Sequence, residues 1–216
     1  MRSAPPSTLS VPVSGADHVR GAADAPVTIV EYGDYECPYC AAARPVLAAL
    51  VDEGQARLVF RNFPLADVHP YALTAALAAE AAAAHGRFWE MHDLLFTHQQ
   101  RLRDADLAGY ARRLGIPVAA AVGDGAQPYG DKVEADFRSG VDSGVRGTPA
   151  LFVAGRRHDG PVDLRTLRGV VRRAAAGGRS PGPDAGGGRS PGPDVGGGRS
   201  LGPDAGGGRS PGPDAA

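Results

Sequence analysis

Residues 27–40 read VTIVEYGDYECPYC, and this stretch decides the fold class. Its first half, Val27 to Tyr32, is a β-branched run that Gly33-Asp34 closes, which predicts a strand and a turn. Its second half ends in two cysteines separated by two residues. Pro38 stands between them, where proline favours the first position of a helix. The stretch therefore predicts a strand, a short loop and a helix that begins at a dithiol.

The residues that follow extend this unit. Apolar residues recur at helical spacing from Pro38 to Glu53, and Gly54 can end that helix. Arg57 to Phe63 then predicts a second strand, which Pro64 ends. A strand, a helix and a strand in so short a span indicate two parallel strands joined by a helical crossover.

The C-terminal half predicts further helices and strands. Residues 70–140 have strong helical periodicity, which predicts a helical insertion before the rest of the sheet. Ala150 to Ala154 predicts a buried strand, and Arg156 to Asp159 a short partner after a turn at Gly155. Asp163 is a good N-cap for a last helix that ends at Ala176. The expected fold class is α/β, a mixed sheet with an inserted helical subdomain.

Three segments are expected along the chain. Residues 1–17 are expected to be a flexible N-terminal segment. Residues 18–176 are expected to form one domain, with the helical insertion at about residues 66–144. A unit rich in glycine and proline begins at Arg179 and repeats to the C-terminus, and it offers few side chains to offset the entropy of an ordered backbone. Residues 177–216 are therefore expected to be a disordered tail, read as a low-complexity expansion rather than a spacer or docking segment.

Charge and hydropathy exclude two classes of partner. Lysine and arginine number 23 against 24 aspartate and glutamate, so the chain has no general attraction to nucleic acid or anionic membranes. The longest apolar stretch, residues 71–84, is mostly alanine and contains Glu80, which predicts a packed helix and no membrane insertion. Residues 1–26 lack the apolar run of a secretory signal, so a cytoplasmic location is expected.

Cys37 and Cys40 are expected to carry the chemistry. Cys37 lies at the predicted helix start, where free backbone N–H groups and the helix dipole lower a thiol pKa from about 8.5 to between roughly 3.5 and 7.5. Cys40 lies one turn further along the same face, near enough to form a disulfide with Cys37 and release a bound substrate sulfur. Cys37 is thus the predicted nucleophile and Cys40 the predicted resolving thiol.

Two other interpretations of the cysteines are weaker. Zinc needs about four ligands, and one pair of cysteines supplies two, so no metal is expected. A purely structural disulfide across so short a loop would add little stability. No cofactor is expected, and the predicted partners are protein or small-molecule thiols and disulfides, with an unidentified electron donor or acceptor.

Three stretches together resemble the DsbA-like branch of the thioredoxin superfamily. They are residues 27–32, residues 33–40 and residues 145–153, the last reading VRGTPALFV. Residues 69–92, which begin HP and end GRFWEMH, are similar to thioredoxin domains fused to NhaA-type sodium/proton antiporters. The resemblance covers roughly residues 18–176 and implies a thioredoxin-like fold and thiol-disulfide exchange.

The resemblance also implies roles for further residues. Glu31 stands where the family keeps a buried acid that accepts a proton from Cys40, and a buried acid has a raised pKa that suits proton exchange. A solvated strand glutamate is the alternative. Pro149 matches the family's cis-proline, which faces the dithiol and leaves backbone groups free for substrate, whereas an ordinary trans proline is the alternative. The predicted substrate-binding residues are Thr148, Pro149, Pro38 and Tyr39.

The predicted function is a protein thiol-disulfide oxidoreductase, with the direction of exchange left open. One alternative is a redox-sensing or regulatory thioredoxin-like module associated with a transporter. Another is a glutaredoxin-like, glutathione-dependent reductase, which the dipeptide Pro38-Tyr39 suggests. The side chains of His69, His85 and His92 are expected at the surface or at helix ends.

Overall fold

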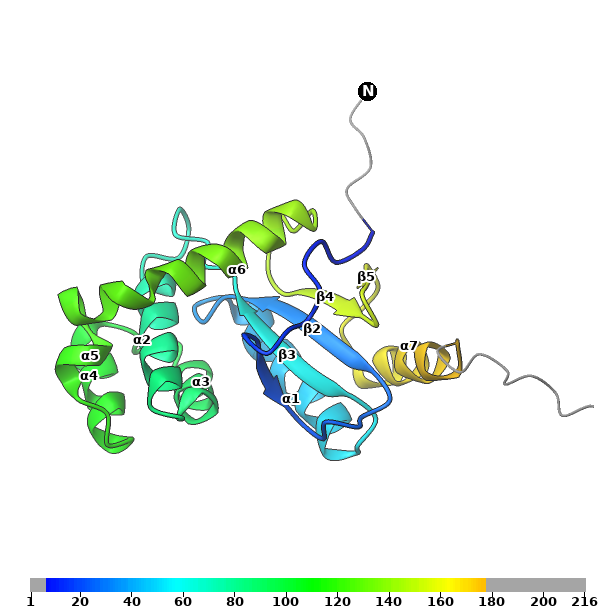
Figure 1. Cartoon of the computed structure of the whole chain (residues 1–216), viewed down its shortest axis with the longest axis horizontal. Helices are drawn as coiled ribbons and strands as arrows, with labels where there is room; N and C mark the ends of the chain where they lie inside the picture. Colours follow the sequence, from blue (N-terminus) through cyan, green and yellow to red (C-terminus); the bar gives the residue numbers. More distant parts are fainter. Residues whose placement is uncertain (1–6, 178–216) are drawn as a thin grey trace, which may run out of the picture. The chain divides into compact units, whose positions relative to one another are not determined.

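The computed structural model describes residues 7–177, which contain a five-stranded mixed sheet (Figure 1). The strands run in the order β1-β3-β2-β4-β5 across the sheet. Strands β2 and β3 are parallel, and the other neighbouring pairs are antiparallel. The bounds are β1 (His18–Arg20), β2 (Thr28–Gly33), β3 (Arg57–Asn62), β4 (Ala150–Val153) and β5 (Arg156–His158).

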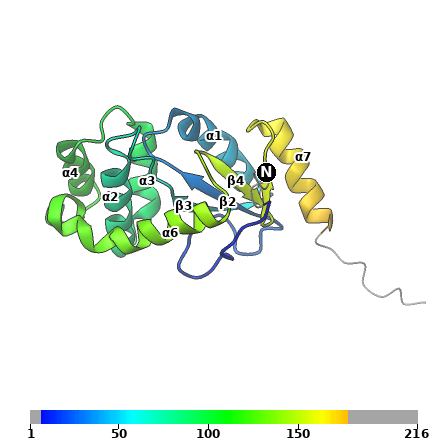
Figure 2. The same cartoon turned by 90° about the horizontal axis from the view of Figure 1, so that it is seen from above.

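Helices join and cover the strands. Helix α1 (Pro38–Asp52) connects the parallel strands β2 and β3, as the sequence predicts. Figure 1 shows α2 to α5 grouped together as the helical insertion, and Figures 1 and 2 show α6 running beside the sheet. These elements are α2 (Ala72–Ala84), α3 (Phe88–Thr97), α4 (Asp104–Arg113), α5 (Val118–Ala121), the 3-10 helix η1 (Gly123–Tyr129), α6 (Gly130–Asp142) and the last helix α7 (Leu164–Gly177).

Alternate side chains of β2 point to opposite faces of the sheet. Ile29 lies in an apolar cluster with side chains of α1 and α7. Val30 and Tyr32 lie in another cluster, against which Phe137 of α6 packs. Glu31 has the parity of Ile29, so its side chain lies on the α1 face of the sheet.

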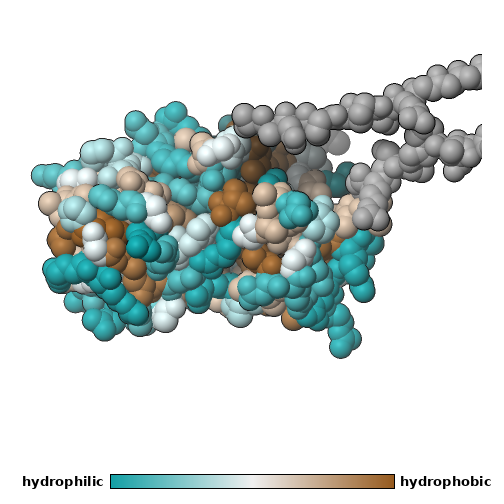
Figure 3. Space-filling model, turned by 60° about the horizontal axis from the view of Figure 1, so that its bottom comes forward, coloured by the Kyte–Doolittle hydropathy of each residue, from teal (hydrophilic) through white to brown (hydrophobic). Residues whose placement is uncertain are grey.

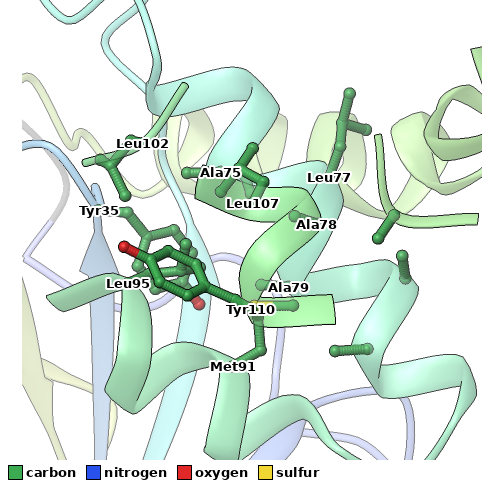
Figure 4. Close-up of a cluster of buried hydrophobic side chains, with 14 of the residues drawn as sticks. Tyr35, Ala75, Leu77, Ala78, Ala79, Met91, Leu95, Leu102, Leu107 and Tyr110 are labelled. Atoms are coloured by element: carbon green, nitrogen blue, oxygen red, sulfur yellow. The ribbon is translucent and has the colours of Figure 1, made fainter. Parts of the chain in front are cut away.

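A third apolar cluster joins the helical insertion to the loop after β2. Helix α2 is buried along most of its length, because its many alanines let neighbouring helices approach closely. Figure 4 shows Tyr35 among the side chains of Met91, Leu95 and Tyr110. Tyr35 therefore anchors the loop that precedes the dithiol in the core of the insertion.

The N-terminal segment differs from the expectation. Residues 7–17, expected to be flexible, are bound to the sheet. Backbone hydrogen bonds pair residues 7–9 with the β5 edge. Arg61 of β3, only 2% exposed, donates to two carbonyl oxygens of the segment and pairs with Asp17 at 2.7 Å. The expectation fails because it left out a buried arginine 44 positions beyond Asp17.

Two further expectations concern the C-terminal tail and membrane insertion. The expected tail lies outside the described residues, apart from Gly177, which ends α7. Within residues 7–177, no helix has both the length and the apolarity needed to cross a membrane. On the face shown in Figure 3, hydrophobic surface forms separate patches among hydrophilic residues.

Candidate active site

The two cysteines lie at the start of α1, both as free thiols. Cys37 is the N-cap, with φ of −73° and ψ of 120°, and Pro38 occupies the first helical turn. The Cys37 side chain therefore lies beside backbone N–H groups that have no partner within the helix. Cys37 is 3% exposed and Cys40 is 0% exposed, so both sulfurs lie below the surface.

Hydrogen bonds lower the pKa of Cys37 to about 5. The largest cause is the hydrogen bond from the Cys40 thiol, which outweighs the opposing effect of burial. The backbone N–H groups of Tyr39 and Cys40 add to it. Cys37 is therefore a thiolate at neutral pH, the reactive form of cysteine.

The environment of Cys40 has the opposite effect. Burial raises the pKa of Cys40 well above its ordinary value, and the hydrogen bond to Cys37 and the charge of Glu31 raise it further. The backbone N–H of Asp34 lies 3.5 Å from the Cys40 sulfur and opposes this rise. The two cysteines thus differ in acidity. Cys37 accepts hydrogen bonds at the start of the helix, which favours its thiolate, whereas Cys40 is buried and donates a hydrogen bond, which favours its thiol.

Glu31 lies beneath the dithiol on β2. Its side chain is 3% exposed, and Oε1 has no hydrogen-bond partner among the described residues. Its partners in register on the neighbouring strands are the apolar residues Phe60 and Leu151. Burial raises the pKa of Glu31 to about 8, and the charge of Cys37 adds to the rise. The carboxyl group can therefore change its protonation state near neutral pH.

The segment before β4 faces Cys37. The Cys37 sulfur lies 3.3 Å from the Thr148 carbonyl oxygen, to which it can donate only when protonated, and the Thr148–Pro149 peptide bond is cis. The Thr148 hydroxyl is buried and has no hydrogen-bond partner among the described residues. Thr148, 111 positions further along the chain, is thus brought against Cys37.

The predicted site residues fall into two groups. Cys37, Cys40 and Glu31 lie together beneath the surface, and Thr148 contacts Cys37. Tyr39 is 73% exposed and lies at the surface beside the dithiol. Pro38 and Tyr39 are therefore accessible to a partner molecule, while the buried thiols and the carboxyl group belong to the first group.

The sequence analysis missed three residues that hold the active-site loop. The Asp34 carboxylate accepts hydrogen bonds from the backbone of Glu36 and from His69 Nδ1, both at 2.8 Å. The Gln99 amide donates to the carbonyl oxygens of Tyr35 and Cys37 at 2.8 and 2.9 Å. Of these three residues, the sequence could have indicated Asp34, because an aspartate in a turn often accepts hydrogen bonds from nearby backbone N–H groups.

The expectation that His92 lies at the surface or at a helix end is wrong. His92 is buried and shares a hydrogen bond of 3.3 Å between Nδ1 and the Tyr35 hydroxyl. Burial lowers the pKa of His92 to about 3, so the imidazole is neutral. Its spacing from Phe88 and Leu95, four residues before and three after, places it on the buried face of α3.

Most of the chain is similar to a known protein family. A family model described as thioredoxin matches residues 13–173. The chain belongs to the thioredoxin family. This confirms the resemblance to DsbA-like proteins, and the solved structures below share the fold.

Curated relatives of this thioredoxin-family chain are antiporters by name. A Na(+)/H(+) antiporter NhaA 1 from Salinispora arenicola is 51% identical over 174 residues, which cover 79% of the chain and 27% of the relative. An antiporter NhaA from Herminiimonas arsenicoxydans is 41% identical over 181 residues, covering 81% of the chain and 28% of the relative. The chain thus spans about a quarter of the length of the curated relatives it matches.

Solved thioredoxin-family structures share the fold. BdbD from Bacillus subtilis superposes with a TM-score of 0.67 at 22% identity, covering 79% of this chain and 99% of that one. A thioredoxin-like oxidoreductase from Silicibacter pomeroyi superposes with a TM-score of 0.65 at 28% identity, covering 76% and 94%. The sheet with its helical insertion is therefore the DsbA-like form of the thioredoxin fold.

Proposed function

We propose that the chain is a thiol-disulfide oxidoreductase in which Cys37 attacks and Cys40 resolves. The observation that carries this proposal is the contrast in acidity between two cysteines one helical turn apart. The pKa of Cys37 is lowered to about 5, and that of Cys40 is raised well above its ordinary value. Only Cys37 is therefore ionised in the resting dithiol at neutral pH.

The first step is attack on a disulfide. The Cys37 thiolate forms a bond with one substrate sulfur, and the substrate S–S bond breaks. The second substrate sulfur leaves as a thiolate and takes a proton from solvent. The product is a mixed disulfide between Cys37 and the substrate, in which Cys37 has lost its negative charge.

The second step needs a base for Cys40, and Glu31 is placed to be that base. The Cys37 charge is one of the two causes that raise the pKa of Glu31. Formation of the mixed disulfide removes that charge, so Glu31 loses its proton more readily and can accept one from Cys40. The Cys40 thiolate then attacks the Cys37 sulfur, closes the Cys37–Cys40 disulfide and releases the substrate as a thiol. The dithiol loses two electrons and the substrate gains them.

A polypeptide is the substrate class that the surface beside the dithiol favours. Tyr39 and Val68 are 73% and 68% exposed, and Tyr71 is also exposed. The Tyr71 backbone N–H donates to the Glu36 carboxylate at 2.7 Å, which holds this segment against the loop before Cys37. Exposed apolar groups near a reactive sulfur suit a chain with apolar side chains. Pro149 and Thr148 are proposed to pair with the backbone of that chain.

Turnover of a model disulfide tests the proposal. The protein is mixed with an excess of a dithiol reductant and with a disulfide-linked polypeptide or, separately, with glutathione disulfide, and release of the reduced substrate is followed with time. We expect faster turnover with the polypeptide, and none in Cys37→Ser. Saturable turnover that depends on glutathione would favour a glutaredoxin-like reductase instead. No turnover with either disulfide would contradict an enzymatic function.

A redox-responsive module within a transporter is the second candidate. The observation that favours it is the 51% identity to a protein named as an antiporter, of which this chain spans 27%. In that case the Cys37–Cys40 disulfide forms and opens reversibly, but the chain does not turn over a substrate. The cytoplasmic location stays a prediction under both candidates.

A further inference from the structure

The segment between β3 and α2 places a histidine beside the loop that carries the dithiol. His69 Nδ1 lies 2.8 Å from the Asp34 carboxylate, and the Leu65 backbone N–H donates to the same oxygen at 2.8 Å. The Asp34 side chain is fully buried, and the His69 side chain is 20% exposed. The pair therefore combines a carboxylate removed from water with an imidazole that can exchange its proton with solvent.

Asp34 contacts both cysteines through its backbone. Its N–H lies 3.5 Å from the Cys40 sulfur, and its carbonyl oxygen accepts the Cys37 N–H at 3.1 Å. The residue bound to His69 thus also forms the turn that holds the two sulfurs. A change in the charge of the Asp34–His69 pair is felt at Cys37 because Asp34 and Cys37 are both buried, where charges are weakly screened.

The other charges that face His69 are negative. They are the carboxylates of Asp34 and Glu36, from the loop after β2, and the Cys37 thiolate at the start of α1. Without a positive charge on His69, the Asp34 carboxylate would be an unbalanced buried anion beside a sulfur that must itself become an anion. Like charges in one site disfavour ionisation of the second group.

We propose that His69 is a positioning residue of the dithiol: its imidazolium balances the buried Asp34 carboxylate and thereby favours the Cys37 thiolate. This inference rests on the proposed function, because it assigns the residue that keeps the attacking sulfur ionised. His69 touches neither sulfur and acts through Asp34 and through its charge.

The direction of the His69 pKa agrees with this arrangement. Burial lowers it, but the hydrogen bond and the charge of Asp34 outweigh burial and raise the pKa above its ordinary value, and the Cys37 charge raises it further. Coupling between two ionising groups is reciprocal, so a thiolate that stabilises the imidazolium is stabilised by it to the same extent.

The test is the ionisation of Cys37 in His69→Gln. Glutamine can still donate a hydrogen bond to Asp34 but carries no charge. The rate of Cys37 alkylation is measured against pH, with the modified cysteine identified by mass spectrometry. We expect the apparent pKa of Cys37 to rise by a fraction of a unit, because the variant loses a positive charge that acts on the thiolate through Asp34. His69→Lys should restore part of the shift. The matched control is His85→Gln at an exposed histidine that ends α2, which should leave the profile unchanged.

A second measurement applies to the unaltered protein. The His69 imidazole is titrated by NMR in the dithiol form and in the Cys37–Cys40 disulfide form. We expect a higher His69 pKa in the dithiol form, where the thiolate is present. Equal values in both forms, or an unchanged Cys37 profile in His69→Gln, would overturn the inference. Neither readout uses turnover, so a failure here is distinct from a failure of the proposed enzymatic function.

Discussion

Glu31 and Arg61 are two buried charged residues on adjacent parallel strands, and they differ in how their polar atoms are bound. Glu31 pairs in register with Phe60, and Arg61 pairs with Tyr32, so the two lie one position apart. The Arg61 guanidinium donates to the Asp17 carboxylate, to two backbone carbonyl oxygens and to the Tyr32 hydroxyl. Oε1 of Glu31 has no hydrogen-bond partner among the described residues.

The comparison separates a buried charge that stabilises the fold from a buried group that can gain or lose a proton. A buried ion whose hydrogen bonds are complete holds its charge and fixes the chain around it, as Arg61 does for the N-terminal segment. A buried acid without such partners has a raised pKa and can gain or lose a proton. The sheet thus carries an anchor at Arg61 and, at Glu31, an acid whose raised pKa suits the proton exchange that we propose.

The largest expected effect is on the pH dependence of stability. The pKa of Glu31 is raised to about 8, so between about pH 4.5 and 8 the folded protein holds a proton that the unfolded chain has lost. Stability therefore falls with rising pH by about 1.4 kcal/mol per unit from this group. The pKa of Cys37 is lowered to about 5, which gives an opposite slope from about pH 5 upward. The two contributions nearly cancel in the unaltered dithiol protein.

Replacing Glu31 with Gln removes the fall in stability with rising pH that Glu31 causes and leaves the rise that Cys37 causes. Relative to the unaltered protein, Glu31→Gln should gain about 1.4 kcal/mol of stability per pH unit, or about 4 kcal/mol from pH 5 to 8. Cys37→Ser should show a relative change of opposite sign, over a narrower range because Cys37 itself raises the pKa of Glu31. Urea unfolding in the presence of a reductant measures both. Parallel pH profiles for Glu31→Gln and the unaltered protein would contradict a buried proton at Glu31.

Arg61→Met should cost about 3 kcal/mol of stability, because it leaves the Asp17 carboxylate buried without its partner. The reactivity of Cys37 should stay the same in the folded fraction. Chemical denaturation gives the first value and alkylation kinetics the second. Arg57→Met is the matched control on the same strand, and it should cost less than about 1 kcal/mol, since its side chain is more exposed. Equal losses in the two variants would refute the anchoring role.

Glu31→Gln should also slow release of the mixed disulfide by roughly 100-fold, the usual contribution of a positioned base. Formation of the mixed disulfide should change little, because Cys37 is already ionised. Rapid-quench experiments with a disulfide substrate resolve the two steps. Equal slowing of both steps would remove the assigned role of Glu31.

Tyr32→Phe gives the smallest expected effect. The Tyr32 hydroxyl accepts from Arg61 at 3.0 Å and shares a hydrogen bond with Ser139 at 2.8 Å. Its removal should cost about 1 kcal/mol, since Arg61 keeps its other partners. A loss as large as that of Arg61→Met would show that the hydroxyl, and not the ion pair, carries the anchor.

Local patterns explain which parts of the fold the sequence predicts. Strand β2, helix α1 and strand β3 follow from β-branched runs, glycine turns and helical spacing within forty residues. Strand β1 was not predicted, because its three residues have no pattern of their own. It exists through pairing with β3, where His18 lies opposite Phe60.

The same distinction holds for the candidate site. Cys37 and Cys40 are a local motif and can be found by their spacing. The Asp34–His69 pair joins residues 35 positions apart, and it forms because β2 and β3 end together, with Gly33 beside Asn62. Periodicity could have placed His92 on the buried face of α3, but its hydrogen bond to Tyr35 depends on a loop that enters the helical core.

The most direct test of the account is the separate titration of the two sulfurs. Thiolate absorbance is measured against pH in Cys40→Ser and in Cys37→Ser, and each variant is then incubated with a disulfide substrate and separated by non-reducing electrophoresis. Cys37 should ionise well below its ordinary pKa, because a serine hydroxyl at position 40 can still donate to its sulfur, and Cys40 only well above its ordinary pKa. Cys40→Ser should accumulate a covalent adduct that a reductant dissolves, and Cys37→Ser should form none. Turnover by Cys37→Ser, or an adduct that accumulates at Cys40, would contradict the assignment of Cys37 as the nucleophile.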